Sequence, residues 1–319
     1  MKSNEKIVVT SGSAYVDIDV LACSISYVSL LQLLGKDAIA VHSGPFNETI
    51  PNYIRGWDFT FQKKIPTNSK INKFVLVDVS DPLYFEDFVS NNDIIEIYDH
   101  HFGFEKFWFS KLNSASKIEH VGACATLIWE EFINANMEKH IEPTNANLLY
   151  IAIKANTLNL KANITSLRDK AAIEQLEKYI DLPVDWLSKY YNEIERSVIS
   201  NVEVAISKDL KKTQFNNYNY TIGQLELWDT EKFFQTNDIF NLIKLGLNID
   251  IEQPDRWFLI ISDVKQGYNY IVTDNKLTQI LLSKILDISF DGWIAKTNSL
   301  WMRKEVLREI HKEVAHGIK

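Results

Sequence analysis

Short apolar runs alternate with longer segments of helical periodicity through the first half of the chain. Four runs have the length and composition of buried strands: residues 7–10, 38–41, 74–77 and 94–98. Four segments repeat apolar residues at helical spacing or begin with a helix-capping pattern: residues 20–34, 123–133, 145–154 and 166–179. Because strands alternate with helices, the pattern predicts a doubly wound, mainly parallel α/β sheet.

The pattern changes after Pro183, which disfavours a continued helix. Strand-like runs with longer polar gaps follow at residues 220–227, 257–261 and 268–272. Helical segments are expected at residues 238–245, 278–286 and 303–312. We therefore predict two domains, residues 1–183 and a smaller α/β domain over residues 184–319, with an active site in the cleft between them.

Acidic residues and histidines follow three of the predicted strands. Asp17 and Asp19 come after the first strand, Asp78 follows the third, and Asp99, His100 and His101 follow the fourth. In an open α/β sheet, ligands bind at the carboxyl ends of the strands, so these side chains are expected to converge. Carboxylates and imidazoles gathered in this way suit Mn²⁺ or Mg²⁺.

Composition narrows the classes of function. The net charge of −8 over 319 residues opposes binding to extended nucleic acid, which needs a basic footprint. A small anion remains possible because bound metal ions can outweigh the global field. The two cysteines, Cys23 and Cys124, lack metal-ligand spacing and are expected to be buried thiols.

The chain is expected to be cytoplasmic. Its first six residues are polar and lack the apolar stretch of a signal peptide. No apolar run approaches the roughly 20 residues that span a bilayer.

The ordered motifs resemble the DHH phosphoesterase superfamily. They are GSAYVDID at 12–19, LVD at 76–78, DHH at 99–101, VGACAT at 121–126 and ANT at 155–157. The second half resembles the accessory DHHA2 domain, and MRKEVL at 302–307 is similar to its substrate loop. The resemblance covers nearly the whole chain. It indicates the branch that holds manganese-dependent inorganic pyrophosphatases, exopolyphosphatases and prune-like proteins.

The resemblance implies a two-metal site in residues 1–183, the DHH catalytic domain, and a substrate-binding role for residues 184–319. The positions that match the family's metal ligands are Ser13, Asp17 and Asp78 for one metal and Asp19, Asp78, His100 and Asn156 for the other. The implied substrate-binding residues are His101, Arg303 and Lys304. Asp78, His101 and Asp99 would serve catalysis, with Asp99 orienting a ligand histidine.

Two positions depart from the pattern of the pyrophosphatases. Ser13 stands where those enzymes have a metal-binding histidine, and Asn156 stands where the family usually has an aspartate. A hydroxyl is a poorer ligand than an imidazole, and the amide removes one negative charge. We expect weaker metal binding, and the sequence leaves open whether one or two ions bind.

The leading hypothesis is a metal-dependent phosphohydrolase that uses metal-activated water to cleave a phosphoanhydride in pyrophosphate or short polyphosphate, or an ester in a small nucleotide. The missing histidine at Ser13 favours polyphosphate. The alternative is a degenerate relative that binds a phosphorylated ligand or a protein partner with little hydrolysis. A nuclease of short RNA is opposed by the acidic charge and by the absence of a Gly-Gly-Gly-His element. Oligomeric state is left open.

Simpler explanations exist for single residues. An aspartate after a strand, such as Asp78, is often a turn or cap residue, and Asp81 is expected to cap the following turn. His101 could be a neutral, hydrogen-bonded core histidine. Arg303 and Lys304 begin a charged helix and could form its solvated face.

Overall fold

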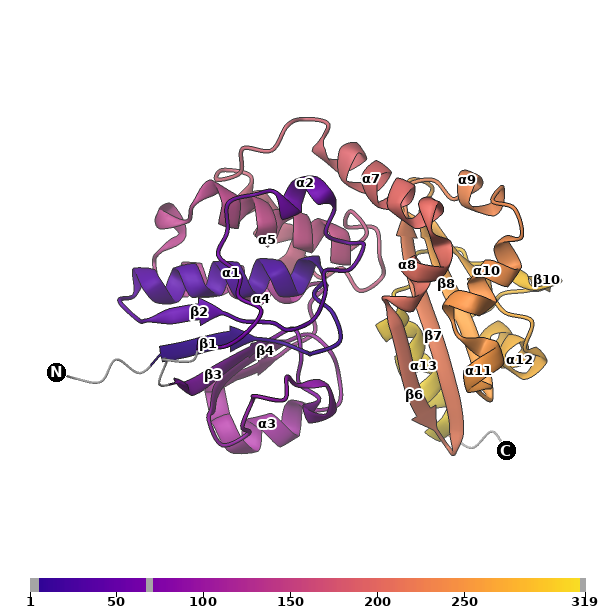
Figure 1. The fold of residues 1–319 in the computed structure, drawn as a ribbon, viewed down its shortest axis with the longest axis horizontal. Coiled ribbons are helices and arrows are strands. Elements are labelled where there is room, and N and C mark those ends of the chain that lie inside the picture. The colour runs from indigo at the N-terminus through magenta and orange to yellow at the C-terminus, as the bar shows by residue number, and fades with distance from the viewer. Residues whose placement is uncertain (1–5, 67–70, 316–319) are drawn as a thin grey trace. The chain divides into compact units, whose positions relative to one another are not determined.

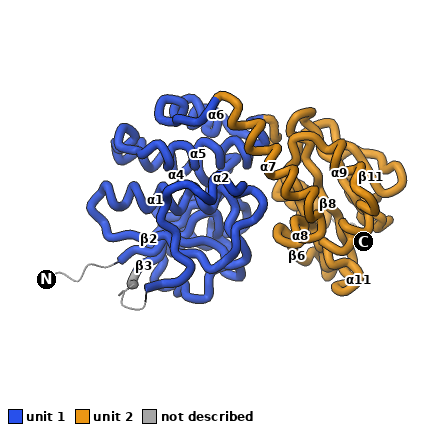
Figure 2. Tube along the Cα trace, turned by 45° about the horizontal axis from the view of Figure 1, so that its top comes forward, with its two compact units in different colours: residues 1–160, 165–183 blue, residues 161–164, 184–319 orange. Residues whose placement is uncertain are grey.

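The computed structural model describes residues 6–66 and 71–315 and divides the chain into two compact units (Figure 2). The first unit comprises Met1–Leu160 with Thr165–Pro183, and the second comprises Lys161–Ile164 with Val184–Lys319. The polar residues 1–5, on which the expectation of no signal peptide rests, lie outside the described residues. The cleft expected between the two domains stays a prediction.

The first unit is built on a five-stranded sheet in the order β2-β1-β3-β4-β5, and every neighbouring pair is parallel. Its strands are β1 (Lys6–Thr10), β2 (Ala38–Ala40), β3 (Ile71–Val77), β4 (Ile94–Asp99) and β5 (Ser116–Ile118). The predicted parallel sheet is confirmed. The sequence pattern did not predict β5, because three residues with one apolar side chain carry no periodicity.

Helices cover both faces of this sheet, with α1, α4 and α5 on one side and α3 on the other (Figure 1). The helical elements are α1 (Ile18–Leu33), α2 (Asn52–Arg55), η1 (Pro82–Tyr84), α3 (Glu105–Leu112), η2 (Asn113–Ala115), α4 (Cys124–Asn134), η3 (Glu138–His140), α5 (Pro143–Asn156) and α6 (Leu167–Leu176). After α1, Gly35 adopts a φ of 74°, as expected for a residue that ends a helix.

Alternate residues of the strands pack on opposite faces, as the strand period requires. One face carries a core cluster that includes Val8, Leu76 and Ile97, together with Trp108 of α3. The indole of Trp108 is fully buried, and its Nε1 donates to the Ser80 carbonyl at 2.6 Å. The packing of Trp108 therefore fixes α3 against the strands whose ends carry the candidate site.

A buried carboxylate joins α6 to the start of α4. Ser166 and Asp169 form the predicted N-terminal cap of α6, here a complete capping box. Asp169 also accepts hydrogen bonds from the backbone N–H of Gly122 at 2.8 Å and from the Thr126 hydroxyl at 2.6 Å. A Cβ atom at Gly122 would lie 2.4 Å from Thr157 Cγ2, so only glycine fits there.

The second unit contains a six-stranded sheet in the order β10-β11-β9-β8-β7-β6, in which only β7 and β8 pair in parallel. Its strands are β6 (Leu210–Phe215), β7 (Tyr218–Leu227), β8 (Arg256–Asp263), β9 (Tyr268–Val272), β10 (Phe290–Asp291) and β11 (Ile294–Lys296). Strands β8 and β9 are consecutive and pair antiparallel, so they form a hairpin.

The helices of the second unit are α7 (Trp186–Ser200), α8 (Val202–Ser207), α9 (Glu231–Phe234), α10 (Ile239–Gly246), α11 (Ile249–Glu252), α12 (Lys276–Leu286) and α13 (Arg303–Ala315). The core between the sheet and α12 and α13 contains Ile222, Phe258, Leu282 and Val306. The two units therefore each have an apolar core of their own.

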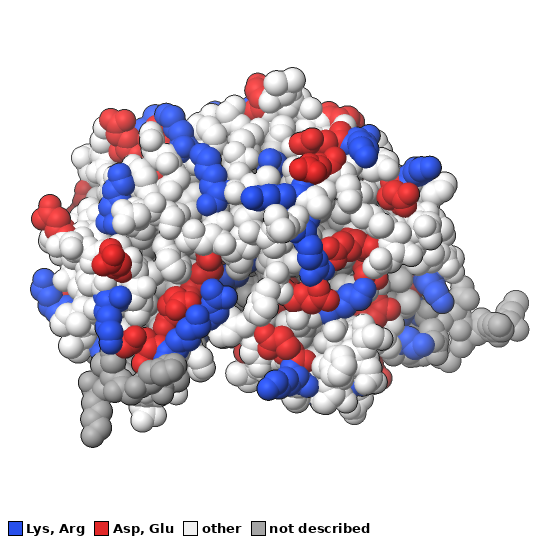
Figure 3. Space-filling view, turned by 180° about the vertical axis from the view of Figure 1, so that it is seen from behind, with Lys and Arg blue, Asp and Glu red and all other residues white. Residues whose placement is uncertain are grey.

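The surface shows no gathering of one charge on the face drawn in Figure 3, where basic and acidic side chains are interspersed. This agrees with the net charge of −8, which opposes binding to extended nucleic acid. Within the two described stretches, none of the helices has both the length and the apolar character needed to cross a bilayer.

A buried histidine makes stability depend on pH. His42 is fully buried, its Nε2 lies 2.7 Å from the Ser24 hydroxyl, and burial, aided by Lys63, lowers its pKa to about 3. The unfolded chain binds a proton near pH 6.5 whereas the folded chain does not, so stability falls as pH drops from 6.5 toward 3.

When the pH is lowered from 7 to 5, the free energy of unfolding of His42→Gln should fall by about 2 kcal/mol less than that of the wild type, as urea unfolding would measure. Equal losses would contradict this origin.

Gly122 lies just before α4. Gly122→Ala should destabilise the first unit, because the added methyl group would collide with the Thr157 side chain. Overpacking of this kind costs about 1–3 kcal/mol, which thermal or urea unfolding would measure. Gly56→Ala is the matched control, since its new methyl group would meet nothing closer than 3.5 Å and its φ of −86° suits alanine. A loss for Gly122→Ala no larger than that of the control would refute the steric argument.

Candidate metal centre

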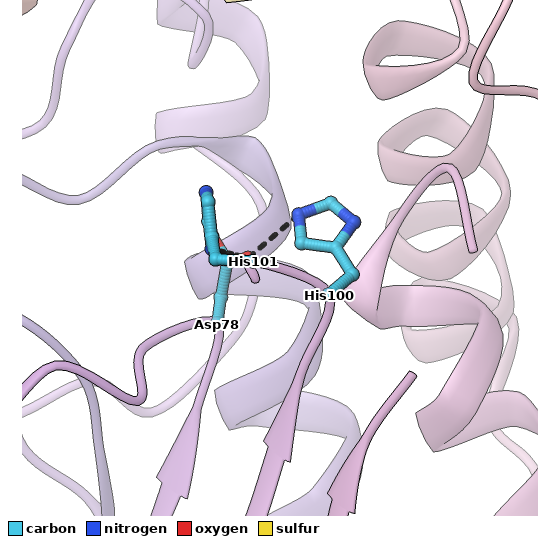
Figure 4. Close-up of side chains that lie close together, drawn as sticks. All are labelled: Asp78, His100 and His101. Carbon is cyan, nitrogen blue, oxygen red and sulfur yellow. Dashed lines mark ion pairs between the residues drawn. The ribbon is translucent and has the colours of Figure 1, made fainter. Parts of the chain in front are cut away.

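Three side chains with metal-binding atoms meet at the carboxyl ends of β3 and β4 (Figure 4). Asp78 directly follows β3, and His100 and His101 directly follow β4, its neighbour in the sheet. One donor atom from each of the three residues lies within 4.8 Å of the others. The parallel register of the two strands therefore brings the DHH motif beside the strand-ending aspartate.

Asp78 and His100 form the closest pair of donor atoms in this cluster. Asp78 Oδ1 lies 3.0 Å from His100 Nε2, and both side chains are largely shielded from solvent. Asp78 has a φ of 56°, a left-handed conformation that is uncommon for residues other than glycine. Its N–H donates to the Tyr98 carbonyl at 2.8 Å, a bond that extends the pairing of β3 with β4 and supports this turn.

Asp19 is held by the start of α4. Its fully buried carboxylate accepts hydrogen bonds from the N–H groups of Cys124 at 2.8 Å and Ala125 at 2.9 Å. The Cys23 thiol donates to the same carboxylate at 3.4 Å. Amides at a helix N-terminus stabilise negative charge, and these hydrogen bonds fix the Asp19 carboxylate with its Oδ2 3.8 Å from His100 Nε2.

Asp17 caps α1, because its Oδ1 accepts the N–H of Val20 at 2.9 Å. The sequence allowed both a cap and a metal ligand at such a position. The cap is now observed, and the metal-binding role stays a prediction.

The carboxylates crowd one another in a poorly solvated place. The pKa of Asp78 is raised well above its ordinary value, by burial first and then by the charges of Asp19 and Asp17. Within the described residues, Asp78 Oδ1 accepts no hydrogen bond despite being buried. A divalent cation would relieve the repulsion, and carboxylate oxygens with an imidazole nitrogen suit Mn²⁺. The residues present therefore fit a metal ion.

Asp99 orients the ring of His101. Its fully buried Oδ1 accepts the backbone N–H groups of His100 at 2.7 Å and His101 at 3.2 Å, and it lies 2.8 Å from His101 Nδ1. Burial alone would raise the pKa of Asp99, but the neighbouring His101 and these hydrogen bonds bring it below its ordinary value. Since the His101 side chain is 48% exposed, its Nε2 is the ring nitrogen that a ligand can reach.

The two positions that depart from the pyrophosphatase pattern lie in different settings. Ser13 is an exposed loop residue whose N–H donates to the Tyr84 carbonyl at 2.9 Å. Asn156 is the last residue of α5, and its Nδ2 donates to the Ala152 carbonyl at 3.3 Å, so its Oδ1 is the atom suited to a cation. Their roles as metal ligands stay predictions.

Arg303 makes an ion pair that the sequence did not reveal. Its guanidinium donates to the Asp209 carbonyl and to Asp209 Oδ1, each at 2.7 Å, and its side chain is only 15% exposed. This bidentate pair joins the start of α13 to the residue before β6. Arg303 and the adjacent Lys304 stay predicted phosphate-binding residues, but Arg303 already has an anionic partner.

Sequence reasoning missed further contacts at the site. Cys23 and Cys124 are buried thiols as predicted, and both contact Asp19, which was not foreseen. The spacing of Asp19 and Cys23 by four residues in one helix was an available signal. The contact of Asp19 with Cys124 and the contact of Arg303 with Asp209 each join residues more than 90 positions apart, for which a single sequence holds no signal.

Comparisons with known proteins agree with this architecture. The chain is 23% identical over 91% of its length to a "probable manganese-dependent inorganic pyrophosphatase" of Lactobacillus acidophilus, covering 92% of that protein. A protein of the same description from Clostridium acetobutylicum is 22% identical, with 95% of this chain and 96% of that protein covered. No family model matches the chain.

A solved structure has the same fold. It is described as a putative family II inorganic pyrophosphatase of Methanococcus jannaschii, with a TM-score of 0.71 at 20% identity, covering 98% of this chain and 100% of that one. The resemblance inferred from the motifs is thereby confirmed: the chain shares the two-unit α/β fold of this pyrophosphatase structure and is similar in sequence to manganese-dependent inorganic pyrophosphatases.

Asp78→Ala and His100→Ala should each weaken Mn²⁺ binding at least tenfold, because each removes a donor atom from the closest pair. Isothermal titration calorimetry on metal-stripped protein would measure this. Asp81→Ala is the matched control, since this nearby acid caps η1 through the Leu83 N–H. It should keep the affinity of the wild type. Unchanged Mn²⁺ affinity in Asp78→Ala would show that the metal binds elsewhere.

Proposed function

We propose that the chain is a manganese-dependent phosphohydrolase that cleaves pyrophosphate. The observation that carries this proposal is the buried donor cluster of Asp78 and His100 with Asp19 beside it, at the carboxyl edge of a parallel sheet. The similarity to manganese-dependent pyrophosphatases supports both the metal and the substrate.

Each residue has a role that follows from its surroundings. Asp19, Asp78 and His100 would hold the metal, with Asp17, Ser13 and Asn156 as the further ligands that the motifs imply. When bound, the metal supplies Lewis acidity, which lowers the pKa of water and offsets charge on phosphoryl oxygens.

His101 would contact the substrate directly. Asp99 engages its Nδ1, so Nε2 faces away from the carboxylate and is the ring nitrogen that can meet a phosphoryl group. The lowered pKa of Asp99 keeps that residue anionic, so its carboxylate holds the His101 ring in this orientation.

Pyrophosphate is the preferred substrate in this proposal, with short polyphosphate second. The preference for polyphosphate rested on Ser13 alone, whereas the curated relatives are described as pyrophosphatases. Those relatives do not support the degenerate, non-hydrolytic alternative.

The test is phosphate release by metal-stripped protein supplied with Mn²⁺ or Mg²⁺, with pyrophosphate and tripolyphosphate as substrates. We expect Mn²⁺-dependent release that is fastest with pyrophosphate, is lost in Asp78→Ala and is retained in Asp81→Ala. Faster phosphate release from tripolyphosphate than from pyrophosphate would indicate that short polyphosphate is the preferred substrate. No release above the Asp78→Ala background with either metal would refute the proposed activity.

Asn156→Asp should raise Mn²⁺ affinity about tenfold, because it restores a negative charge at the end of α5. Calorimetry with Mn²⁺ measures the affinity directly, and phosphate release at limiting Mn²⁺ should rise in parallel. Asn159→Asp, three residues later in the following turn, adds the same charge as a control. An equal gain in both variants would indicate a general charge effect in place of a ligand at Asn156.

A further inference from the structure

A hollow of about 740 Å³ lies wholly within the second unit. It is bordered by α9 and the loop before it, by the β8–β9 hairpin and by Trp293 just before β11. Its volume falls in the range of small-molecule sites. None of its lining residues was singled out by the motifs that indicate phosphate chemistry.

Aromatic rings form much of this hollow. Tyr268 and Tyr270 alternate along β9 and so project from the same face, with ring centroids 5.4 Å apart. Phe234 of α9 meets Tyr270 edge to face at 4.8 Å, and Trp293 completes the aromatic lining. All four rings are only partly buried, so aromatic surface faces the hollow.

The charges around these rings are mostly negative. Three carboxylates, those of Asp229, Glu231 and Asp263, line the hollow against one ammonium, that of Lys265. Lys265 is 3.0 Å from Asp229, so it offsets one of the three charges. Asp263 is buried and fixed by the N–H and hydroxyl of Thr230 at 3.1 and 2.9 Å.

This field also acts on Tyr268. The pKa of Tyr268 is raised, by burial first, then by Tyr270, and further by the carboxylates of Asp263 and Asp229. The phenol of Tyr268 therefore stays neutral near neutral pH.

We propose that this hollow binds a small alkylammonium cation. Aromatic faces attract cations through their quadrupoles, and the excess of carboxylates adds charge attraction. Lys296 Nζ already lies 3.6 Å from the Tyr268 ring centroid, which shows that such a ring accepts an ammonium group and leaves Phe234, Tyr270 and Trp293 for the ligand. With Lys296 included, three carboxylates still exceed two ammonium groups. Pyrophosphate or a nucleotide would be repelled by the same carboxylates, so the site is independent of the metal centre and its proposed activity.

The test is calorimetric titration of the full chain with choline and with 3,3-dimethylbutan-1-ol, its uncharged isostere. We expect choline to bind with a Kd of about 1 mM and the alcohol to bind at least tenfold more weakly, because only the charge differs. Equal binding of the two would show an apolar pocket and overturn the proposal, as would tighter binding of AMP than of choline.

Two variants locate the site. Glu231→Gln removes an exposed charge and Tyr270→Leu removes a ring face, and each should weaken choline binding at least threefold. Asp250→Asn, an exposed acid of α11 that is not part of the lining, is the control and should bind as the wild type does. Unchanged affinity in Glu231→Gln, whose exposed side chain leaves folding intact, would place choline elsewhere. Phosphate release should stay unchanged in Glu231→Gln, so this test and that of the metal centre fail separately.

Discussion

Repulsion among carboxylates at the carboxyl edge of the first sheet is the constraint on which the rest of the site depends. The fold offsets it residue by residue: the amides at the start of α4 hold Asp19, and the ring of His101 pairs with Asp99. Among the described residues, the buried Oδ1 of Asp78 accepts no hydrogen bond and has only the rings of His100, at 3.0 Å, and His101, at 3.9 Å, close to it. Asp78 therefore carries the least compensated charge of the site, and its Oδ1 lies beside His100 Nε2, the donor atom best placed to share a cation with it.

The surrounding architecture serves to hold these groups in place. The parallel pairing of β3 with β4 sets Asp78 beside the DHH motif, and the left-handed turn at Asp78 follows immediately after the last paired residue. The start of α4 is in turn tied to α6 through Asp169, which accepts the N–H of Gly122, and Thr157 leaves no room for a side chain at that glycine. The loop at Gly122 and the starts of α4 and α6 thus hold the Asp19 carboxylate in place, which would otherwise be costly to bury.

Much of the first unit could be predicted because its strands are short apolar runs and its helices repeat apolar residues at regular spacing. The acidic strand ends were also visible, since parallel strands must end at one edge. The ion pair of Arg303 with Asp209 and the pairing of Asp99 with the ring of His101 were not, because they depend on side-chain directions in the folded chain. Likewise β5 and the aromatic hollow carry no periodic signal: β5 is only three residues long, and Phe234 of α9 meets Tyr270 of β9 only in the folded chain.

The central claim is that Asp78, His100 and Asp19 bind manganese. The most direct measurement is a crystal structure of the protein grown with Mn²⁺, with anomalous differences recorded at the manganese absorption edge. We expect an anomalous peak within coordination distance of Asp78 Oδ1 and His100 Nε2. A fully occupied peak away from both atoms, with none between them, would contradict it.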